Sequence, residues 1–178
     1  MNHCLVHRLA AVLAAGIVLA ACGGEHSPAG HSVVSSGKEA TGLEAVPAEV
    51  LQAARAARPE LRIEDAEQEV RGGQEYYDIA GKMPDGSELE LDMTTVDGAW
   101  TVVEIQRDIA LVQVAEGARQ ALSTVKPDWG PTRIIESDQG DGVIIYEFLG
   151  PGPDSGEIKI EVKLEDNQAE ALRDEWVH

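Results

Sequence analysis

Apolar residues recur every three or four positions in two stretches of the chain, which is the spacing of one face of an α-helix. The first stretch is Leu43–Ala57 and the second is Leu111–Val125. A proline follows closely on each stretch, at Pro59 and Pro127. Proline lacks an amide hydrogen and disfavours helix in the residue before it, so we expect both helices to end there.

The residues after each helix alternate between apolar and polar, which is the period of a β-strand with one buried face. In Glu88–Met93 the apolar side chains share one face and the acidic side chains the other, and Glu157–Leu164 repeats the pattern. Such a sheet is antiparallel, with a helix covering its dry face. Gly, Pro, Asp and Asn cluster where turns are expected. Further strands are expected near Arg62–Val70, Trp100–Ile105, Thr132–Ser137 and Ala171–Trp176.

The two halves of this pattern match each other. The helical stretches align from residue 43 to residue 111, an offset of 68, and the strands align from residue 77 to residue 146, an offset of 69. Two stretches that agree on nearly one offset indicate a duplication, with chance similarity as the alternative interpretation. We therefore predict an α+β fold of two tandem repeats, 43–108 and 109–178, each with one N-terminal helix packed on about four antiparallel strands.

Two segments of the first repeat carry a resemblance to a known family. They are VPAEVLQAARAARPEL, residues 46–61, and EYYDIAGKMPDGSELELDMTTVDG, residues 75–98. A helix that begins at Val-Pro, a Tyr-bearing strand, a turn, an acidic and apolar strand and an Asp-Gly turn together resemble the PepSY and PepSY-like family. The resemblance is weaker over 111–178, where no proline follows Val114 and Asn167 replaces the turn glycine.

Tandem copies of such a unit in an exported chain look like the arrangement of the secreted β-lactamase-inhibitor proteins. In those proteins two helix-plus-sheet units grip a partner enzyme. The resemblance therefore implies binding or inhibition of an exported protein. It supplies no shared catalytic residues.

The first 22 residues follow a different pattern. Arg8 precedes the apolar run LAAVLAAGIVLAA, and Cys22 follows the run directly. A basic start, a short apolar core and small residues at its end predict an export signal over 1–21, because the run is too short to cross a bilayer comfortably. The end of the run resembles a bacterial lipobox, which implies cleavage before Cys22 and lipid on its sulfur. An uncleaved anchor or a buried cysteine is the alternative.

Residues 22–42 are rich in Gly, Ser and other polar residues, and this composition predicts a flexible tether. Gly23 follows the cysteine at the position where an Asp would signal retention in the inner membrane of Gram-negative bacteria. The predicted location is therefore the periplasmic side of a membrane, with the outer membrane favoured. Contact with the membrane is expected through the N-terminal lipid alone.

The charge balance narrows the class of partner. The chain has 14 Lys and Arg against 32 Asp and Glu, and its formal net charge is −18 at pH 7. Removing the predicted signal would remove Arg8 and no acidic residue. A strongly negative body disfavours binding to nucleic acid or anionic lipid, because phosphate contacts need Lys and Arg. The charge suits simple solubility or a basic partner.

Histidine and cysteine are confined to the ends of the chain. No residue between Glu39 and Val177 is His or Cys. This excludes a Ser-His-Asp or Cys-His nucleophile system and a His/Cys zinc site from that region. The carboxylates are so numerous that no catalytic pair stands out, and Glu136–Phe148 lacks the spacing of a calcium loop. We therefore predict that the protein is no enzyme and holds no metal or cofactor.

Aromatic and acidic side chains on the polar strand face are the candidate partner-binding residues. Exposed large aromatics are common hot spots in protein interfaces, although a tryptophan that caps a small core is the alternative. We predict a lipid-anchored envelope module that binds or inhibits an exported protein through this polar sheet face. A structural or assembly lipoprotein of the outer membrane is the alternative. The candidate residues are Tyr76, Glu88, Glu90, Asp92, Trp100 and Trp129.

Overall fold

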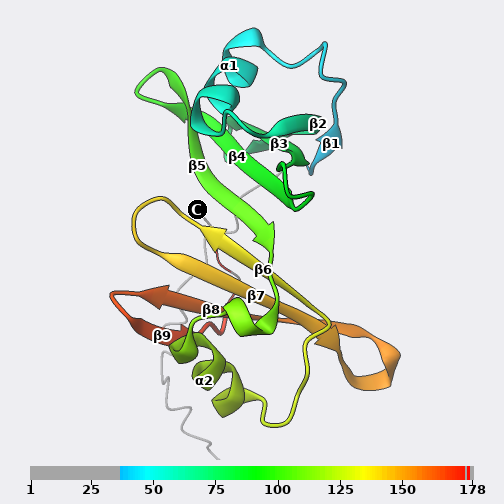
Figure 1. The fold of residues 1–178 in the computed structure, drawn as a ribbon, viewed down its shortest axis with the longest axis vertical. Helices are drawn as coiled ribbons and strands as arrows, with labels where there is room; N and C mark the ends of the chain where they lie inside the picture. The colour runs from blue at the N-terminus through cyan, green and yellow to red at the C-terminus, as the bar shows by residue number, and fades with distance from the viewer. Residues whose placement is uncertain (1–36, 175, 177–178) are drawn as a thin grey trace, which may run out of the picture. The chain divides into compact units, whose positions relative to one another are not determined.

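The computed structural model describes residues 37–174 and 176, which form one nine-stranded antiparallel sheet and two α-helices (Figure 1). The strands lie across the sheet in the order in which they occur along the chain. The predicted signal peptide and Cys22 lie outside the described residues. The elements are β1 Glu39–Ala40, α1 Ala48–Ala57, β2 Arg62–Arg71, β3 Gln74–Lys82, β4 Glu88–Val96, β5 Ala99–Asp108, α2 Glu116–Val125, β6 Arg133–Asp138, β7 Ile144–Pro151, β8 Glu157–Glu165 and β9 Gln168–Ala171, with short 3-10 turns at Leu111–Gln113 and Pro153–Ser155.

The predicted fold class of two tandem helix-plus-four-strand repeats is wrong, because the strands form a single sheet. The end of β5 pairs with β6, with Ile105 opposite Asp138 and Asp108 opposite Ile135. At the other side β1 adds a further strand, with Glu39 opposite Gln68. Alternation along a strand assigns side chains to faces, but it does not say which strand edges pair. The sequence pattern therefore gives no reason to join β5 to β6.

The last strand is also displaced from its predicted position. The sequence pattern favours a strand near Ala171–Trp176, whereas β9 begins at Gln168. Asp166 and Asn167 both have positive φ, 50° and 63°, and they form a two-residue hairpin turn between β8 and β9. Such a turn starts the return strand at the next residue.

Both helices end where the prolines predict. The last helical residues are Ala57 and Val125, each two residues before its proline. The amide of the residue that follows each helix donates a hydrogen bond of 2.9 Å to the carbonyl of Ala54 or Leu122. Within residues 37–174 and 176, neither helix combines the length and the apolar content that a membrane span requires.

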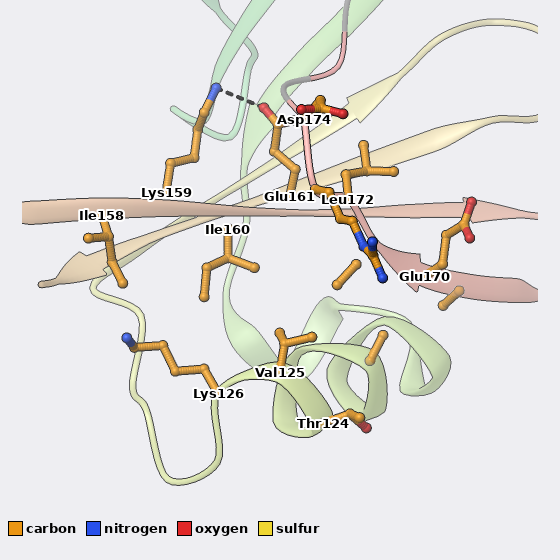
Figure 2. A pocket seen from close by; sticks show the side chains of 14 residues that line it. Thr124, Val125, Lys126, Ile158, Lys159, Ile160, Glu161, Glu170, Leu172 and Asp174 are labelled. Atoms are coloured by element: carbon orange, nitrogen blue, oxygen red, sulfur yellow. Dashed lines mark ion pairs between the residues drawn. The ribbon is translucent and has the colours of Figure 1, made fainter. Parts of the chain in front are cut away.

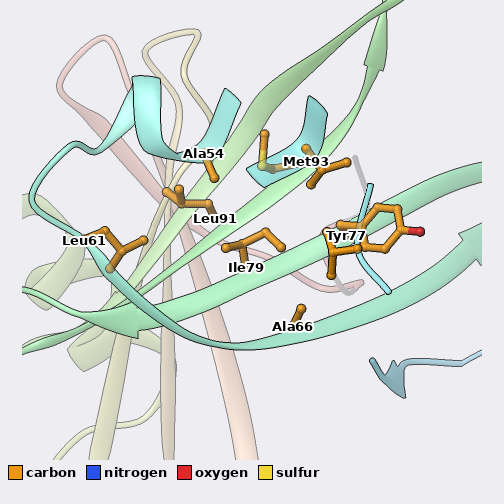
Figure 3. Packing of buried hydrophobic residues seen from close by; sticks show 9 residues of the cluster. Ala54, Leu61, Ala66, Tyr77, Ile79, Leu91 and Met93 are labelled. Carbon is orange, nitrogen blue, oxygen red and sulfur yellow. The ribbon is translucent and has the colours of Figure 1, made fainter. Parts of the chain in front are cut away.

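Two hydrophobic clusters lie on one face of the sheet, each under one helix. The register that places Ile105 opposite Asp138 also places Ile134 on the face of Ile105, so the clusters share a face. Figure 3 shows the first cluster, in which Leu91 and Ile79 lie beneath Ala54 of α1 and Met93 lies to one side of it. The second cluster packs α2 against three strands, and its buried members are Val114, Ala118, Leu122, Ile134, Tyr146, Phe148 and Val162.

Replacing Leu91 with alanine is expected to lower the free energy of unfolding by about 2–5 kcal/mol, because the side chain is fully buried and its loss leaves a cavity. The matched control is Val96→Ala on the same strand, where 43% of the residue is exposed and the change should stay within about 0.5 kcal/mol. Urea unfolding monitored by circular dichroism measures both. Equal losses in the two variants would contradict the packing described.

Candidate functional site

The six predicted partner-binding residues are divided between the two faces of the sheet. Tyr76, Glu88, Glu90 and Asp92 have the strand parity opposite to the buried Tyr77 and Leu91, so they lie on the face away from α1. The two tryptophans pack against the hydrophobic clusters on the helix-covered face. The structure therefore does not gather the six residues on one surface.

Each tryptophan has a packing role. The ring of Trp100 meets Tyr77 edge-on, with 5.4 Å between the ring centroids. Trp129 packs against the second cluster, and its Nε1 donates a hydrogen bond of 2.8 Å to the carbonyl oxygen of Pro151. A Cβ on Gly150 would lie 2.8 Å from the Trp129 ring, so only glycine fits beside it. Both side chains thus close the core.

Tyr76 is half-buried and covered by a side chain of its own sheet. The guanidinium carbon of Arg71 lies 4.5 Å from the centroid of the Tyr76 ring. Arg71 is held there by Glu69, whose Oε2 is 2.9 Å from the guanidinium Nη2. A cation above an aromatic ring is attracted by the ring quadrupole. The ring face that the sequence suggests for a partner is therefore occupied by Arg71.

The polar face contains a buried row of carboxylates around Asp92. The register of β3, β4 and β5 places Asp78 and Glu104 directly opposite Asp92 on its two neighbouring strands. Asp92 is 2% exposed, and the other two are 3% exposed. Ser137 of β6 donates a hydrogen bond to Glu104. Sequence reasoning missed this row because alternation marks these positions as polar without indicating that they are buried.

A lysine from the segment before β1 reaches into this row. The Nζ atom of Lys38 lies 2.5 Å from Asp78 Oδ2 and 3.5 Å from Glu90 Oε1. Asp78, Glu90 and Asp92 each present one carboxylate oxygen, and these oxygens lie within 4.8 Å of one another. Among the described residues, this group is the one whose spacing could hold a metal ion.

Burial controls the protonation of this cluster. It raises the pKa of Asp92 to about 9, and the negative charges of Asp78 and Glu104 act in the same direction. Burial likewise raises the pKa of Glu90. Burial disfavours the charge of Lys38, but the hydrogen bond and charge of Asp78 outweigh it and raise the lysine pKa. At neutral pH Asp92 therefore retains a proton while Lys38 is charged.

A pocket of about 910 Å³ lies at the opposite end of the sheet, between α2, β8 and the segment after β9. Figure 2 shows Ile158 and Ile160 pointing from β8 toward α2, where Val125 stands at the helix end. Val125 is 54% exposed although it is apolar. The remaining apolar lining comes from Ala121, Ala169, Ala171 and Leu172.

The pocket forms because β9 is shorter than β8. β9 pairs only with Val162–Glu165. The amide of Leu172 then donates a hydrogen bond of 2.8 Å to the carbonyl of Glu161, and beyond this point the chain no longer pairs with β8. The apolar side chains of Ile158 and Ile160 consequently line an opening beside the helix.

No protein-family model, curated protein or solved structure matches the chain. The site is therefore interpreted from its own geometry.

Asp92→Asn is expected to reduce the pH dependence of stability between about pH 5 and pH 8. The folded-state pKa of about 9 exceeds the ordinary value near 3.9, so the folded protein binds one more proton than the unfolded chain in this range. The stability that this proton contributes is complete below about pH 4 and is lost as pH rises through 9. A neutral amide does not titrate, so the variant loses this contribution. The charged and titratable groups that still face the position in the variant are Lys38, Arg71, Asp78, Glu90 and Glu104.

Urea unfolding of both proteins at pH 5 and pH 8, with EDTA present, measures the difference. Asp97→Asn in the exposed turn between β4 and β5 is the matched control and should leave the pH dependence unchanged. The assignment would be contradicted if the free energy of unfolding changed by the same amount from pH 5 to pH 8 in the wild type and in Asp92→Asn.

Proposed function

We propose that the chain is a protein-binding module of the cell envelope that takes an extended, apolar and basic segment of an exported protein into the pocket between α2, β8 and β9. The observation that carries the proposal is the apolar lining of this pocket, with Val125 half exposed in its wall. The buried carboxylate row and the Arg71–Tyr76 stack make the polar sheet face around Asp92 the weaker candidate.

The size and chemistry of the pocket suit a polypeptide segment. Its volume of about 910 Å³ lies near the top of the range of about 300–1,000 Å³ in which ligand pockets fall. Ile158, Ile160 and Leu172 offer branched apolar side chains to an occupant. Removing such a side chain from water stabilises a complex by about 1.5–3 kcal/mol. An occupant with two or three apolar side chains would gain about 3–9 kcal/mol in this way, which offsets part or all of the cost of association.

Charge favours a basic occupant. The chain carries a net charge of −18, and long-range attraction steers partners of opposite charge toward it. At the rim, Glu170 and Asp174 are exposed acids. Lys159 is already paired, with its Nζ 2.7 Å from Glu161 Oε1. The Lys126 ammonium lies over the Trp129 ring at 5.8 Å. Arg173 is a further cation in the lining, so the attraction depends on the acidic body as a whole.

Two features of the sequence support binding as the class of function. Histidine and cysteine are absent from residues 40–176, which removes the usual nucleophile and base systems. The resemblance of residues 43–107 to the PepSY-like family points to binding or inhibition of an exported protein. The same proposal places the module on a membrane through lipid at Cys22, which the lipobox-like end of the apolar run supports.

Val125→Glu is expected to weaken peptide binding by more than about tenfold, because it places a charge in the apolar wall and removes a contact worth about 1.5–3 kcal/mol. Selection of displayed twelve-residue peptides on the full chain should enrich apolar sequences that contain Lys or Arg. Fluorescence anisotropy of an enriched peptide then measures the affinity for each variant.

The matched control is Val96→Glu, since Val96 is 43% exposed on β4 and does not line the pocket. This variant should bind as tightly as the wild type. Failure to enrich any common sequence, or equal weakening by the two variants, would overturn the pocket as the binding site.

Cys22→Ser is expected to abolish incorporation of labelled palmitate and to release the protein from the membrane fraction. The thiol is the proposed attachment point, and stable anchoring requires more than one acyl chain. Cys4→Ser is the matched control, because Cys4 lies within the predicted signal peptide. Labelling that survives in Cys22→Ser would exclude the proposed anchor.

A further inference from the structure

The carboxylate row on the polar face lacks the donors that buried acids require. Asp92 is 2% exposed, and its Oδ1 accepts no hydrogen bond within residues 37–174 and 176. Asp78 is 3% exposed, and its Oδ1 likewise accepts none there. A buried polar atom without a partner loses its hydration and gains nothing in exchange. Asp78 and Asp92 both belong to the group whose carboxylate oxygens lie within 4.8 Å of one another, and a cation bound there would give these buried carboxylates a partner.

Lys38 supplies only some of the donors that these carboxylates lack. Its single ammonium serves Asp78 at 2.5 Å and Glu90 at 3.5 Å. The charges of Asp78, Glu90 and Asp92 all act on it. The lysine side chain is 41% exposed, so it can swing into solvent without unpacking a core. The lysine is therefore a replaceable occupant of the cluster.

The ligand set favours calcium among the cations. It consists of oxygen atoms alone, which suits hard divalent ions. Calcium accepts six to eight oxygen ligands at about 2.3–2.6 Å in flexible geometry, whereas magnesium requires a nearly ideal octahedron at about 2.0–2.1 Å. The three oxygens lie within 4.8 Å of one another, so they could surround calcium with little movement.

Water can reach one member of the cluster, Glu90. A second pocket of about 170 Å³ borders Glu90 and Gln106, and acidic side chains line much of it, including Glu64, Asp65 and Glu88. Calcium takes six to eight oxygen ligands, and water supplies those that the protein does not. An acidic approach also concentrates cations near the opening.

We propose that Asp78, Glu90 and Asp92 form a calcium site, and that calcium displaces both the ammonium group of Lys38 and the proton of Asp92 from it. Glu104 lies next to the three ligands, because it is directly opposite Asp92, and it accepts a hydrogen bond from Ser137. Sequence motifs miss such a site because its ligands come from neighbouring strands rather than from one loop. The proposal is independent of the peptide pocket, which lies on β8, β9 and α2.

Isothermal titration of the full chain with calcium chloride tests the site. We expect one calcium ion to bind per chain, more tightly than magnesium. Glu90→Gln should weaken calcium binding by at least about tenfold, since it replaces a charged ligand. Glu88→Gln is the matched control on the same strand face. Glu88 lines the approach but is no ligand, and its exposed charge is screened by solvent, so this variant should weaken binding by less than about twofold. Lys38→Gln should tighten binding, because it removes the competing cation.

Four results would overturn the proposal or one part of it. The first is that neither the wild type nor Lys38→Gln binds calcium. The second is that Glu88→Gln and Glu90→Gln weaken binding equally, which would show attraction to acidic surface alone. The third is that magnesium binds more tightly than calcium, which would exclude the assignment of the ion. Weaker calcium binding by Lys38→Gln would exclude displacement of the lysine.

Discussion

The pairing of β5 with β6 is the constraint on which the rest of the structure depends. Four residues of β5, Ile105–Asp108, meet β6 in register, and this short ladder makes one sheet of two halves. Because side chains alternate across a strand, the register also decides that α1 and α2 cover the same face. A slip of one residue would carry the second cluster to the opposite face. Ion pairs reinforce the register: Arg107 with Glu136 at 2.6 Å and Arg133 with Asp108 at 3.0 Å.

The same register determines what happens on the polar face. Glu104 lies on β5 and Ser137 on β6, so the hydrogen bond between them crosses the junction. A sheet that ended at β5 would leave Glu104 at an edge, where water could hydrate it. The continued sheet instead contributes to a buried environment in which carboxylates of β3, β4 and β5 lie side by side. Burial and charge are thus in conflict at Asp92, and such conflicts are more common at functional positions than elsewhere.

The elements follow from the sequence more closely than their assembly does. The apolar spacing and the prolines locate α1 and α2, and alternation locates β4 and β8, because these signals are local. The β5–β6 ladder and the two-residue β1 depend on pairing between distant edges, which no local pattern encodes. The surroundings of the candidate site residues are not encoded locally, for a related reason. Tyr76 has the parity of an outward residue, yet Arg71, which is five positions earlier, covers its ring. Exposure depends on neighbours across strands, and these are known only from the assembled sheet.

The strand order across the sheet equals the order along the chain, and this has a consequence for how the molecule is made. Every ladder joins strands that are consecutive along the chain, with α1 between β1 and β2 and α2 between β5 and β6, so each strand has to await only the next strand before it can pair. The first cluster draws its buried members from residues 46–93. That core can consequently form from residues that all precede α2 in the chain. Each later strand then finds its template already in place, and a sheet that forms in chain order has a single growing edge at a time.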